Sequence, residues 1–378
     1  MDHHRTGDSP DLLAWLGLRL TPGIGSVRFL RLMEAFGSPR AVLAAPEERL
    51  AAVKGIPSVV AQAISRGERL AEPRAELARL EGMGARLVTL DHADYPPLLK
   101  SVFAPPPLLF AWGDLKPCHG GAVAMVGSRG HSSYGRRVAE EVARDLALAG
   151  KSVISGLARG IDTAAHTAAL KAGGHTVGVL GCGLDVAYPP ENRGLIKEMA
   201  LKGAVVSEFP LGAPPAAGNF PVRNRVISGL AQAVVVVEAG RKSGSLITAR
   251  HALDQGREVF AVPGPVGSPQ SEGCHDLLRQ GARLLSSAAD ILEPGSLPPA
   301  PKSFLSPAAE KPGSQGPAVS DLPQDWQKVL ELVTINPVHL DLIARESGFK
   351  SQEVTAILVS LEMEGLVEQK PGKHYVRL

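Results

Sequence analysis

Short apolar runs alternate with amphipathic helical stretches through the middle of the chain. Ala122–Val126 is apolar throughout and predicts a buried strand, and a helical pattern extends from the turn after it to about Gly150. Ser152–Ser155 predicts the next strand. This succession of strand, turn, helix and strand is typical of a doubly wound parallel sheet, in which ligands bind beyond the carboxyl ends of the strands. We therefore expect an α/β domain with a binding crevice at that edge.

Further strands are predicted in the same region, at His175–Leu180, Ala204–Ser207, Ala233–Val237 and Glu258–Val262. The run at 233–237 is almost continuous valine, as expected for a central strand buried on both faces. A helical connector is predicted at Pro73–Leu87, and proline-rich stretches at 94–113 predict an edge or covering strand. Residues 73–292 thus form one extended, Rossmann-like, mostly parallel domain in this interpretation.

A small helical domain is predicted at residues 11–72, after a polar segment, 1–10, that we expect to be disordered. It contains two similar phrases, each with a glycine turn before a helix, at Thr21–Gly25 and Val53–Pro57. Both resemble a helix-hairpin-helix (SAM-like) unit, whose turn points backbone N–H groups at a phosphate. In the second turn, Pro57 lacks one such N–H donor. Because glycine often serves only to connect helices, a helical bundle that does not bind DNA is an equal alternative.

The carboxyl-terminal part is predicted to be a winged helix at 323–378, joined by a flexible proline-rich linker at 293–322. Three helices, Trp326–Val333, Asp341–Ser347 and Ser351–Glu364, precede a hairpin around Pro371. This fold usually binds duplex DNA. However, the third helix carries Glu353, Glu362 and Glu364 against Lys350 alone, although Lys370 and Lys373 offer a basic wing. Because a phosphate-facing helix should be basic, we expect this domain to contact protein.

Composition narrows the possible partners. The chain has 378 residues and a formal net charge of only +2, so any nucleic-acid surface must be local. The three cysteines lie far apart, without metal-ligand or disulfide spacing, and we expect reduced thiols. No apolar run approaches the ~20 residues that cross a bilayer, and no apolar segment follows the charged N-terminus. We therefore expect a cytoplasmic protein with no membrane partner.

Four turns at predicted strand ends or helix starts carry the polar chemistry. They contain Gly127, Ser128, Arg129 and Gly130; Gly156, Arg159 and Gly160; Phe220, Arg223, Asn224 and Arg225; and Lys242, Ser243 and Gly244. Arg129 stands where a dinucleotide fingerprint needs its second glycine, and no carboxylate ends the next strand. We therefore expect no nicotinamide, flavin or metal cofactor. Glycine N–H groups and guanidinium forks instead suit phosphate groups.

A single DNA strand can use these turns together. Glycine N–H groups, Arg and Lys bind successive phosphates, and Phe220 offers a face on which a base stacks, worth ~1–3 kcal/mol per base. As an alternative, Arg223 or Arg225 is a structural fork paired with a carboxylate at a strand end, such as Glu208 or Glu238.

Asp162 and His166 stand four residues apart on a predicted helix, a spacing that also suits an acid/base pair. No nucleophile or metal-ligand set accompanies them, so we interpret Asp162 as an N-cap or first-turn carboxylate that stabilises the start of the helix.

Four phrases resemble the DNA-processing protein A family (DprA, also called Smf), in that family's order and between about Tyr95 and Ala289. They are Val126–Arg129, Ser155–Asp162 with Ala165–His166, Phe220–Arg225, and Ser243–Ala249. The resemblance implies a non-enzymatic, homodimeric protein that binds single-stranded DNA, protects incoming DNA in natural transformation and loads the RecA recombinase. It also implies that the DNA ligands are the glycine turns with Arg129, Arg159, Phe220, Arg223, Asn224 and Arg225.

The chain departs from this family at one place, and two alternative functions remain to be weighed. Some relatives place a basic residue shortly before the phenylalanine, where this chain has Ala216, Ala217 and Gly218. A nucleotide-processing enzyme of the phosphoribohydrolase (lysine decarboxylase-like) type shares the expected fold, but it needs a Pro-Gly-Gly turn leading to a catalytic glutamate, which Val237–Thr248 lacks. A purely protein-binding scaffold would leave the clustered arginines unexplained.

Overall fold

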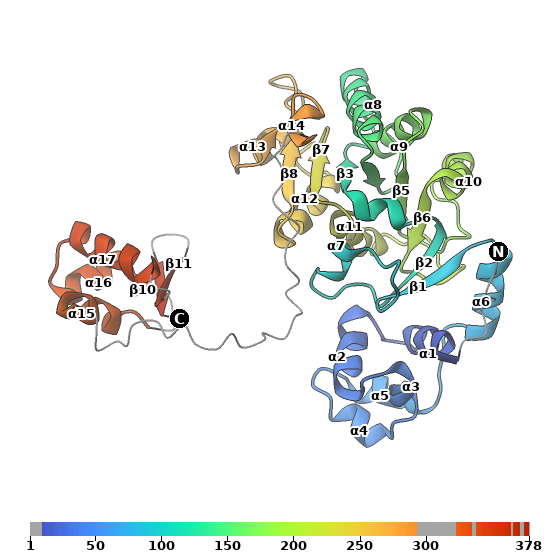
Figure 1. The fold of residues 1–378 in the computed structure, drawn as a ribbon, viewed down its shortest axis with the longest axis horizontal. Helices are drawn as coiled ribbons and strands as arrows, with labels where there is room; N and C mark the ends of the chain where they lie inside the picture. The colour runs from blue at the N-terminus through green and yellow to red at the C-terminus, as the bar shows by residue number, and fades with distance from the viewer. Residues whose placement is uncertain (1–9, 293–322, 335–337, 364–365, 371–373, 378) are drawn as a thin grey trace. The chain divides into compact units, whose positions relative to one another are not determined.

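The computed structural model describes residues 10–292, 323–334, 338–363, 366–370 and 374–377. The chain divides into two compact units, Met1–Leu305 and Ser306–Leu378, each considered by itself (Figure 1). The predicted disordered segment lies outside the described residues except for Pro10, and the whole of the predicted linker, 293–322, lies outside them.

The larger unit is built on a nine-stranded sheet in the order β1-β2-β6-β5-β4-β3-β7-β8-β9. The pairs β1–β2 and β2–β6 are antiparallel, and every neighbouring pair from β6 to β9 is parallel. The strands are Arg86–Thr89 (β1), Leu108–Gly113 (β2), Ala122–Val126 (β3), Ser152–Ser155 (β4), Thr176–Leu180 (β5), Ala204–Ser207 (β6), Ala233–Val236 (β7), Glu258–Ala261 (β8) and Arg283–Leu284 (β9). The predicted mostly parallel α/β sheet is thereby confirmed.

Helices cover both faces of this sheet because its parallel strands are apolar on both sides. In β3, Val123 and Met125 face one hydrophobic core while Ala124 and Val126 face another, as the alternation of a strand requires. The first core is covered by α8 (Ser133–Leu148), α9 (Ile161–Lys171) and α14 (Ala289–Leu292). The second is covered by α7 (Pro97–Lys100), α11 (Asn219–Gly229), α12 (Ser245–Asp254) and α13 (Glu272–Arg279).

The order of the strands reverses beside β3. From β3 the chain proceeds through β4, β5 and β6 toward one edge, and then returns to β7, β8 and β9 on the other side. Because the connections after β3 and β7 leave in opposite directions, a crevice opens between the carboxyl ends of these two strands. The first and fourth predicted turns follow β3 and β7 and therefore meet there.

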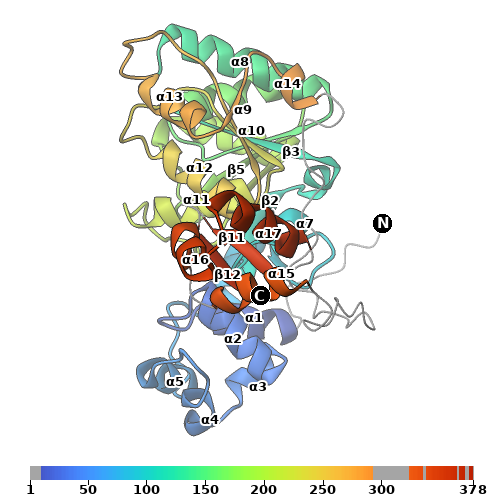
Figure 2. The same ribbon diagram turned by 90° about the vertical axis from the view of Figure 1, so that its left-hand side faces the viewer.

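The amino-terminal helices form a lobe beside the β1 and β2 end of the sheet (Figures 1 and 2). They are α1 (Pro10–Arg19), α2 (Ser26–Phe36), α3 (Pro39–Leu43), α4 (Glu47–Ala51) and α5 (Ser58–Ser65). One hydrophobic core runs from Leu16 and Phe29 in this lobe to Leu108 and Phe110 in β2. α6 (Pro73–Gly82), α10 (Arg193–Lys202) and the single-turn helices η1 (Lys116–Gly120) and η2 (Pro190–Asn192) complete the unit.

The sequence interpretation was wrong at the sheet edge. The helical connector ends at Gly82, because Gly84 adopts a φ of 72° that an L side chain rarely takes, and β1 then begins at Arg86. β1 is therefore the edge strand, and β2, predicted to be the edge or a cover, pairs on both sides.

The smaller unit has the predicted three helices and hairpin of a winged helix, α15 (Gln324–Leu332), α16 (Leu340–Ser347), α17 (Ser351–Met363), β11 (Val367–Lys370) and β12 (His374–Arg377). A two-residue strand that the sequence pattern did not predict, β10 (Val338–His339), pairs with β12. Glu353 accepts a hydrogen bond from the Lys350 N–H, and Glu362 accepts one from the Gln369 N–H. Glu364 and Lys373 lie outside the described residues, as does the side chain of Lys370.

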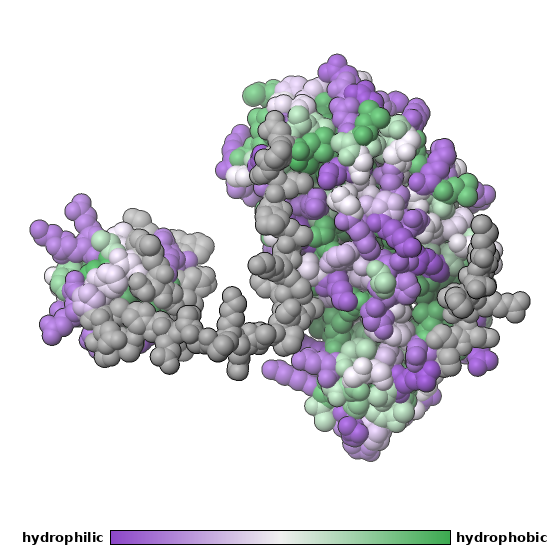
Figure 3. All heavy atoms as spheres, viewed as in Figure 1, coloured by the Kyte–Doolittle hydropathy of each residue, from purple (hydrophilic) through white to green (hydrophobic). Residues whose placement is uncertain are grey.

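The exposed surface of the larger unit is mixed in character. Figure 3 shows hydrophobic residues as separate patches among hydrophilic ones on the face in view. Across the part of the chain that the structure describes, no helix combines the length and the apolar content needed to cross a bilayer.

Candidate nucleic-acid interface

A cleft of about 870 Å³ opens at the carboxyl ends of β3 and β7. It is lined by nine of the predicted site residues, Gly127, Ser128, Arg129, Phe220, Arg223, Asn224, Lys242, Ser243 and Gly244. The other five, Gly130, Gly156, Arg159, Gly160 and Arg225, are not among its lining residues. Most of the predicted residues therefore line one cleft, while two of the predicted cations, Arg159 and Arg225, lie outside it.

The turn after β3 is fixed by Glu238, which follows β7. The Ser132 N–H and hydroxyl donate to the Glu238 carboxylate over 2.8 and 2.6 Å, and the Ser128 N–H donates to the Glu238 carbonyl over 2.7 Å. Ser132 in turn caps α8 by accepting from the Gly135 N–H. Glu238 thus holds the turn that carries Arg129 and does not pair with Arg223 or Arg225.

Phe220 lies beside two arginines. Its ring centre is 5.6 Å from the guanidinium carbon of Arg129 and 5.8 Å from that of Arg223, and it is 5.5 Å from the ring centre of Tyr188. A cation over an aromatic face is favourable, so the ring is fixed in place at the cleft wall. Tyr188 was missed by the sequence reasoning, although it stands in the loop after β5, where an aromatic residue beside a strand end was a usable signal.

Arg223 is buried in the floor of the cleft. Only 5% of the residue is exposed, and its guanidinium donates to the carbonyl oxygens of Gly156, over 2.6 Å, and of Val179. A Cβ on Gly156 would lie 2.8 Å from that guanidinium, so this position requires glycine. Burial lowers the pKa of Arg223 to about 10, which still leaves it charged at neutral pH. Arg223 therefore ties α11 to β4 and β5, and Gly156 makes room for it.

Arg225 lies on the other side of α11, outside the cleft. It donates to Glu208 over 2.5 Å, to the Ala104 carbonyl over 2.9 Å and to the Ser26 hydroxyl over 3.2 Å. Two residues along a helix turn the side chain by roughly 200°, so Arg223 and Arg225 cannot share a face. The alternative interpretation, that one of these arginines pairs with a carboxylate such as Glu208, is therefore correct for Arg225.

Arg159 is exposed beside the cleft and paired with Glu191 through two nitrogen atoms. Its neighbour Gly160 lies against the turn after β3, where a Cβ would come within 2.2 Å of the Ser128 carbonyl oxygen. The Ile161 N–H also donates to that oxygen over 3.2 Å. The turns after β3 and β4 are thus joined, and Arg159 stands next to Ala158, which lines the cleft.

The turn before α12 closes the opposite wall. The Ser243 and Ser245 hydroxyls are 2.7 Å apart, and the Asn224 amide donates to the Gly244 carbonyl over 3.3 Å. Lys242 is exposed here, close to the amino end of α12, which favours an anion. With Arg129 on the facing wall, the cleft presents two exposed cations.

Asp162 and His166 have separate structural partners. Asp162 is buried in the first turn of α9 and accepts from the N–H groups of Gly156 and Ala158, over 3.1 and 3.3 Å. The His166 ring is hydrogen-bonded to the Thr176 hydroxyl over 2.7 Å. No hydrogen bond joins Asp162 to His166 within the described structure, and no three His, Cys, Asp or Glu side chains there are grouped to hold a metal ion.

The buried His166 is expected to make the folded protein less stable as the pH falls. Burial lowers its pKa to about 3, whereas the unfolded chain takes up the proton near 6.5. The unfolded state therefore binds more protons between these values, and stability falls as the pH drops through them. Between pH 7 and pH 5, the free energy of unfolding of the wild type should fall by about 2 kcal/mol more than that of the His166→Asn variant. Urea unfolding of both proteins at the two pH values measures this, and equal losses would contradict it.

Comparisons with known proteins identify the family and its domains. The family model for the DNA recombination-mediator protein A matches residues 86–295, the DprA winged helix domain matches 313–373, and the SAM-like helix-hairpin-helix tandem matches 18–67. Protein Smf of Escherichia coli is 43% identical over 311 residues, which is 80% of each chain.

Two solved structures of relatives are similar to this one. DNA processing protein A from Streptococcus pneumoniae superposes with a TM-score of 0.65 at 36% identity, over 73% of this chain and 95% of that one. DNA processing protein A from Helicobacter pylori, described with its single-stranded DNA binding mode, gives a TM-score of 0.51 at 30% identity, over 56% of this chain and 95% of that one. With a family model that spans more than half of its length, this chain belongs to the DNA recombination-mediator protein A (DprA/Smf) family.

Proposed function

We propose that this protein binds single-stranded DNA in the cleft between β3 and β7, and that it does so without a covalent reaction. The observation that carries the proposal is Phe220, an aromatic ring set in the cleft wall beside Arg129 and Arg223. An aromatic face for a base beside exposed cations for phosphates is the combination that single-strand binding requires.

The predicted site residues divide into two roles in this proposal. Arg129 and Lys242 meet phosphates, and Phe220 stacks on a base. Arg159 joins them once a phosphate displaces Glu191 from its exposed ion pair. The remaining residues shape or brace the walls: Gly127, Ser128, Gly130, Gly156, Gly160, Arg223, Asn224, Ser243 and Gly244. Arg225 serves the far side of α11.

The relatives extend this proposal to a process. Their names describe DNA processing, and the Helicobacter pylori protein binds single-stranded DNA. We propose that this chain likewise processes DNA in natural transformation, in the cytoplasm, with the RecA recombinase and a second copy of itself as partners.

The winged helix is proposed to contact protein. Glu353 and Glu362 on its third helix are held in local hydrogen bonds, so the helix stays acidic where duplex DNA needs cations. We also propose that the chain is divided into domains at residues 11–72, 73–292 and 323–378.

The phosphoribohydrolase alternative finds less support in the cleft. Such an enzyme needs a free glutamate as its acid or base, yet both Glu238 oxygens accept from Ser132, and the carboxylate is buried. Asp162, the one carboxylate among the residues that line the cleft, accepts hydrogen bonds from two backbone N–H groups.

The proposal is tested by fluorescence anisotropy with labelled single-stranded and duplex oligonucleotides of the same sequence. We expect the single strand to bind at least ten-fold more tightly, since only unpaired bases can stack on Phe220. Equal affinity, or tighter binding of the duplex, would contradict the proposal. Release of base from a nucleoside monophosphate would instead support the enzyme.

A further inference from the structure

A second cavity, of about 550 Å³, lies on the other side of α11 from the cleft. One wall is the first hairpin turn of the amino-terminal lobe with the start of α2, which contribute Gly23 and Arg28. The other walls are the segment before β2, with Phe103, and the outer face of α11, with Val222. We refer to it as the hairpin cavity.

The hairpin cavity is positively charged. Its lining includes Arg19, Arg28 and Arg225 but only one carboxylate, Glu208. Glu208 is buried and already paired with Arg225, while the Arg19 guanidinium donates to the Glu208 carbonyl over 2.9 Å. Arg28 is half-buried, and the described contacts give its guanidinium one hydrogen-bond partner, the Gly23 carbonyl, over 2.8 Å. The excess charge suits an anion at the mouth of the cavity, where Arg28 stands.

Phe103 stands at the same mouth and is 89% exposed. It is presented by a strained turn, because the next residue, Ala104, has a φ of 51°, a left-handed conformation that L residues rarely adopt. The Arg225 guanidinium holds this turn through the Ala104 carbonyl. The ion pair between Arg225 and Glu208 therefore supports a strained segment that keeps the Phe103 ring exposed and available to a base.

The two cavities adjoin at the first turn of α11. Phe220 and Pro221 line the cleft, and the next residue, Val222, lines the hairpin cavity and is 46% exposed. A strand that stacks a base on Phe220 and passes over Pro221 thus reaches Val222 and Phe103 directly. Both cavities offer similar chemistry, an aromatic ring beside an arginine.

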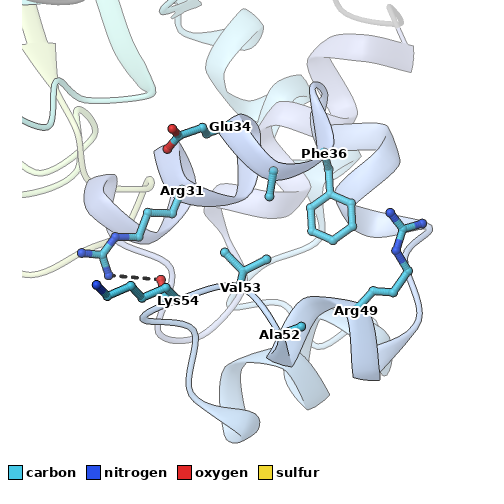
Figure 4. Close-up of a pocket in the computed structure, with 8 residues that line it drawn as sticks. Arg31, Glu34, Phe36, Arg49, Ala52, Val53 and Lys54 are labelled. Carbon is cyan, nitrogen blue, oxygen red and sulfur yellow. Dashed lines mark hydrogen bonds between the residues drawn. The ribbon is translucent and has the colours of Figure 1, made fainter.

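The second hairpin of the lobe differs from the first. Figure 4 shows Arg31 and Lys54 at one end of the pocket between α2 and the turn after α4, and Arg49 beside Phe36 at the other. Arg31 donates to the Lys54 carbonyl over 3.4 Å, and its guanidinium occupies the space of a Cβ on Gly55. The Arg31 guanidinium therefore covers Gly55, although Val53 and Lys54 of the second turn line a pocket of their own, whereas the first turn lines the hairpin cavity.

We propose that the hairpin cavity is a second subsite for the same DNA strand, with Phe103 stacking on a base and Arg28 meeting a phosphate. This inference rests on the proposed function, since the strand enters from the cleft. It assigns to the amino-terminal lobe the binding of the nucleotides that leave the cleft over α11.

Two lengths of oligothymidylate test it by anisotropy, roughly 6 and roughly 15 nucleotides, which lie near the lower and upper ends of typical single-strand site sizes. The Arg28→Ala/Phe103→Ala variant should bind the longer strand about ten-fold more weakly, and the shorter one within two-fold of wild type. The matched control is Lys197→Ala/Leu201→Ala, which removes an exposed cation and an exposed apolar side chain from α10. It should bind both lengths as wild type does.

The same experiment separates the two proposals. Arg129→Ala should weaken both lengths, and if it weakens neither, the cleft is not the binding site and the proposed function fails in this form. If Arg129→Ala weakens both lengths but Arg28→Ala/Phe103→Ala binds both like wild type, only the hairpin cavity proposal is overturned. Equal weakening of both lengths by Arg28→Ala/Phe103→Ala also overturns it, with thermal unfolding of each variant checking the fold.

Discussion

Replacing Arg129 by alanine is expected to weaken the binding of single-stranded DNA by about ten- to a hundred-fold. The side chain is exposed at the cleft, so its loss removes a charge-assisted phosphate contact and one of the two cations that fix the Phe220 ring. Because Arg129 has no buried partner to leave unsatisfied, thermal unfolding of the variant should match that of wild type. Anisotropy with a labelled single strand measures the first effect and calorimetry the second.

The control for Arg129→Ala is Arg144→Ala. Arg144 is also exposed, so its replacement removes the same charge, but it lies near the end of α8 and pairs with Asp145. Its affinity should stay within two-fold of wild type at physiological salt, where exposed charges more than about 8 Å from the ligand are screened. If Arg144→Ala weakened binding as much as Arg129→Ala, the effect would be one of net charge rather than of the cleft.

Replacing Arg223 by alanine is expected to lower the free energy of unfolding by about 3–5 kcal/mol. The guanidinium is buried and bridges the carbonyls of Gly156 and Val179. Burial raises the pKa of Asp162, and the charge of Arg223 opposes that rise. Removal of the guanidinium leaves the two carbonyl oxygens without this donor and the Asp162 carboxylate without this nearby positive charge, and it leaves a cavity. Urea unfolding at pH 7 measures the loss, and single-strand affinity should fall as well, because Phe220 loses one of its supports.

The conservative variant Arg223→Lys separates charge from geometry. Lysine keeps the positive charge but lacks the planar fork that reaches two carbonyls at once, so it should recover only part of the lost stability. An Arg223→Ala protein that unfolded at the wild-type urea concentration would show that the buried guanidinium does not hold β4, β5 and α11 together.

The architecture of the sheet could be predicted because its signals are local. Ala122–Val126, Ser152–Ser155 and Ala204–Ser207 are strands at the predicted bounds, since a short apolar run between turns has few other uses in an α/β domain. The placement of β1 could not be predicted, because the pattern of α6 continues through Leu87 and only the conformation of Gly84 ends it.

The site was less predictable, because its pairings are distant in the sequence. Nothing near Glu238 indicates that its partner is Ser132, and nothing near Arg225 indicates that Ala104 and Glu208 hold it. The phrase Phe220–Arg225 suggested one cluster of ligands, but helical geometry divides it between two faces of α11. Motifs therefore identified the cleft, while the roles of the arginines required the fold.

The salt dependence of single-strand affinity tests the central claim most directly, measured for wild type and for the Arg129→Ala/Arg159→Ala variant. Each phosphate contact contributes about 0.7 to the slope of log affinity against log salt for a single strand. If both arginines meet phosphates in the cleft, the variant should bind more weakly, with a slope shallower by about 1.4. Parallel slopes with equal affinity would contradict the account and place the DNA elsewhere on the protein.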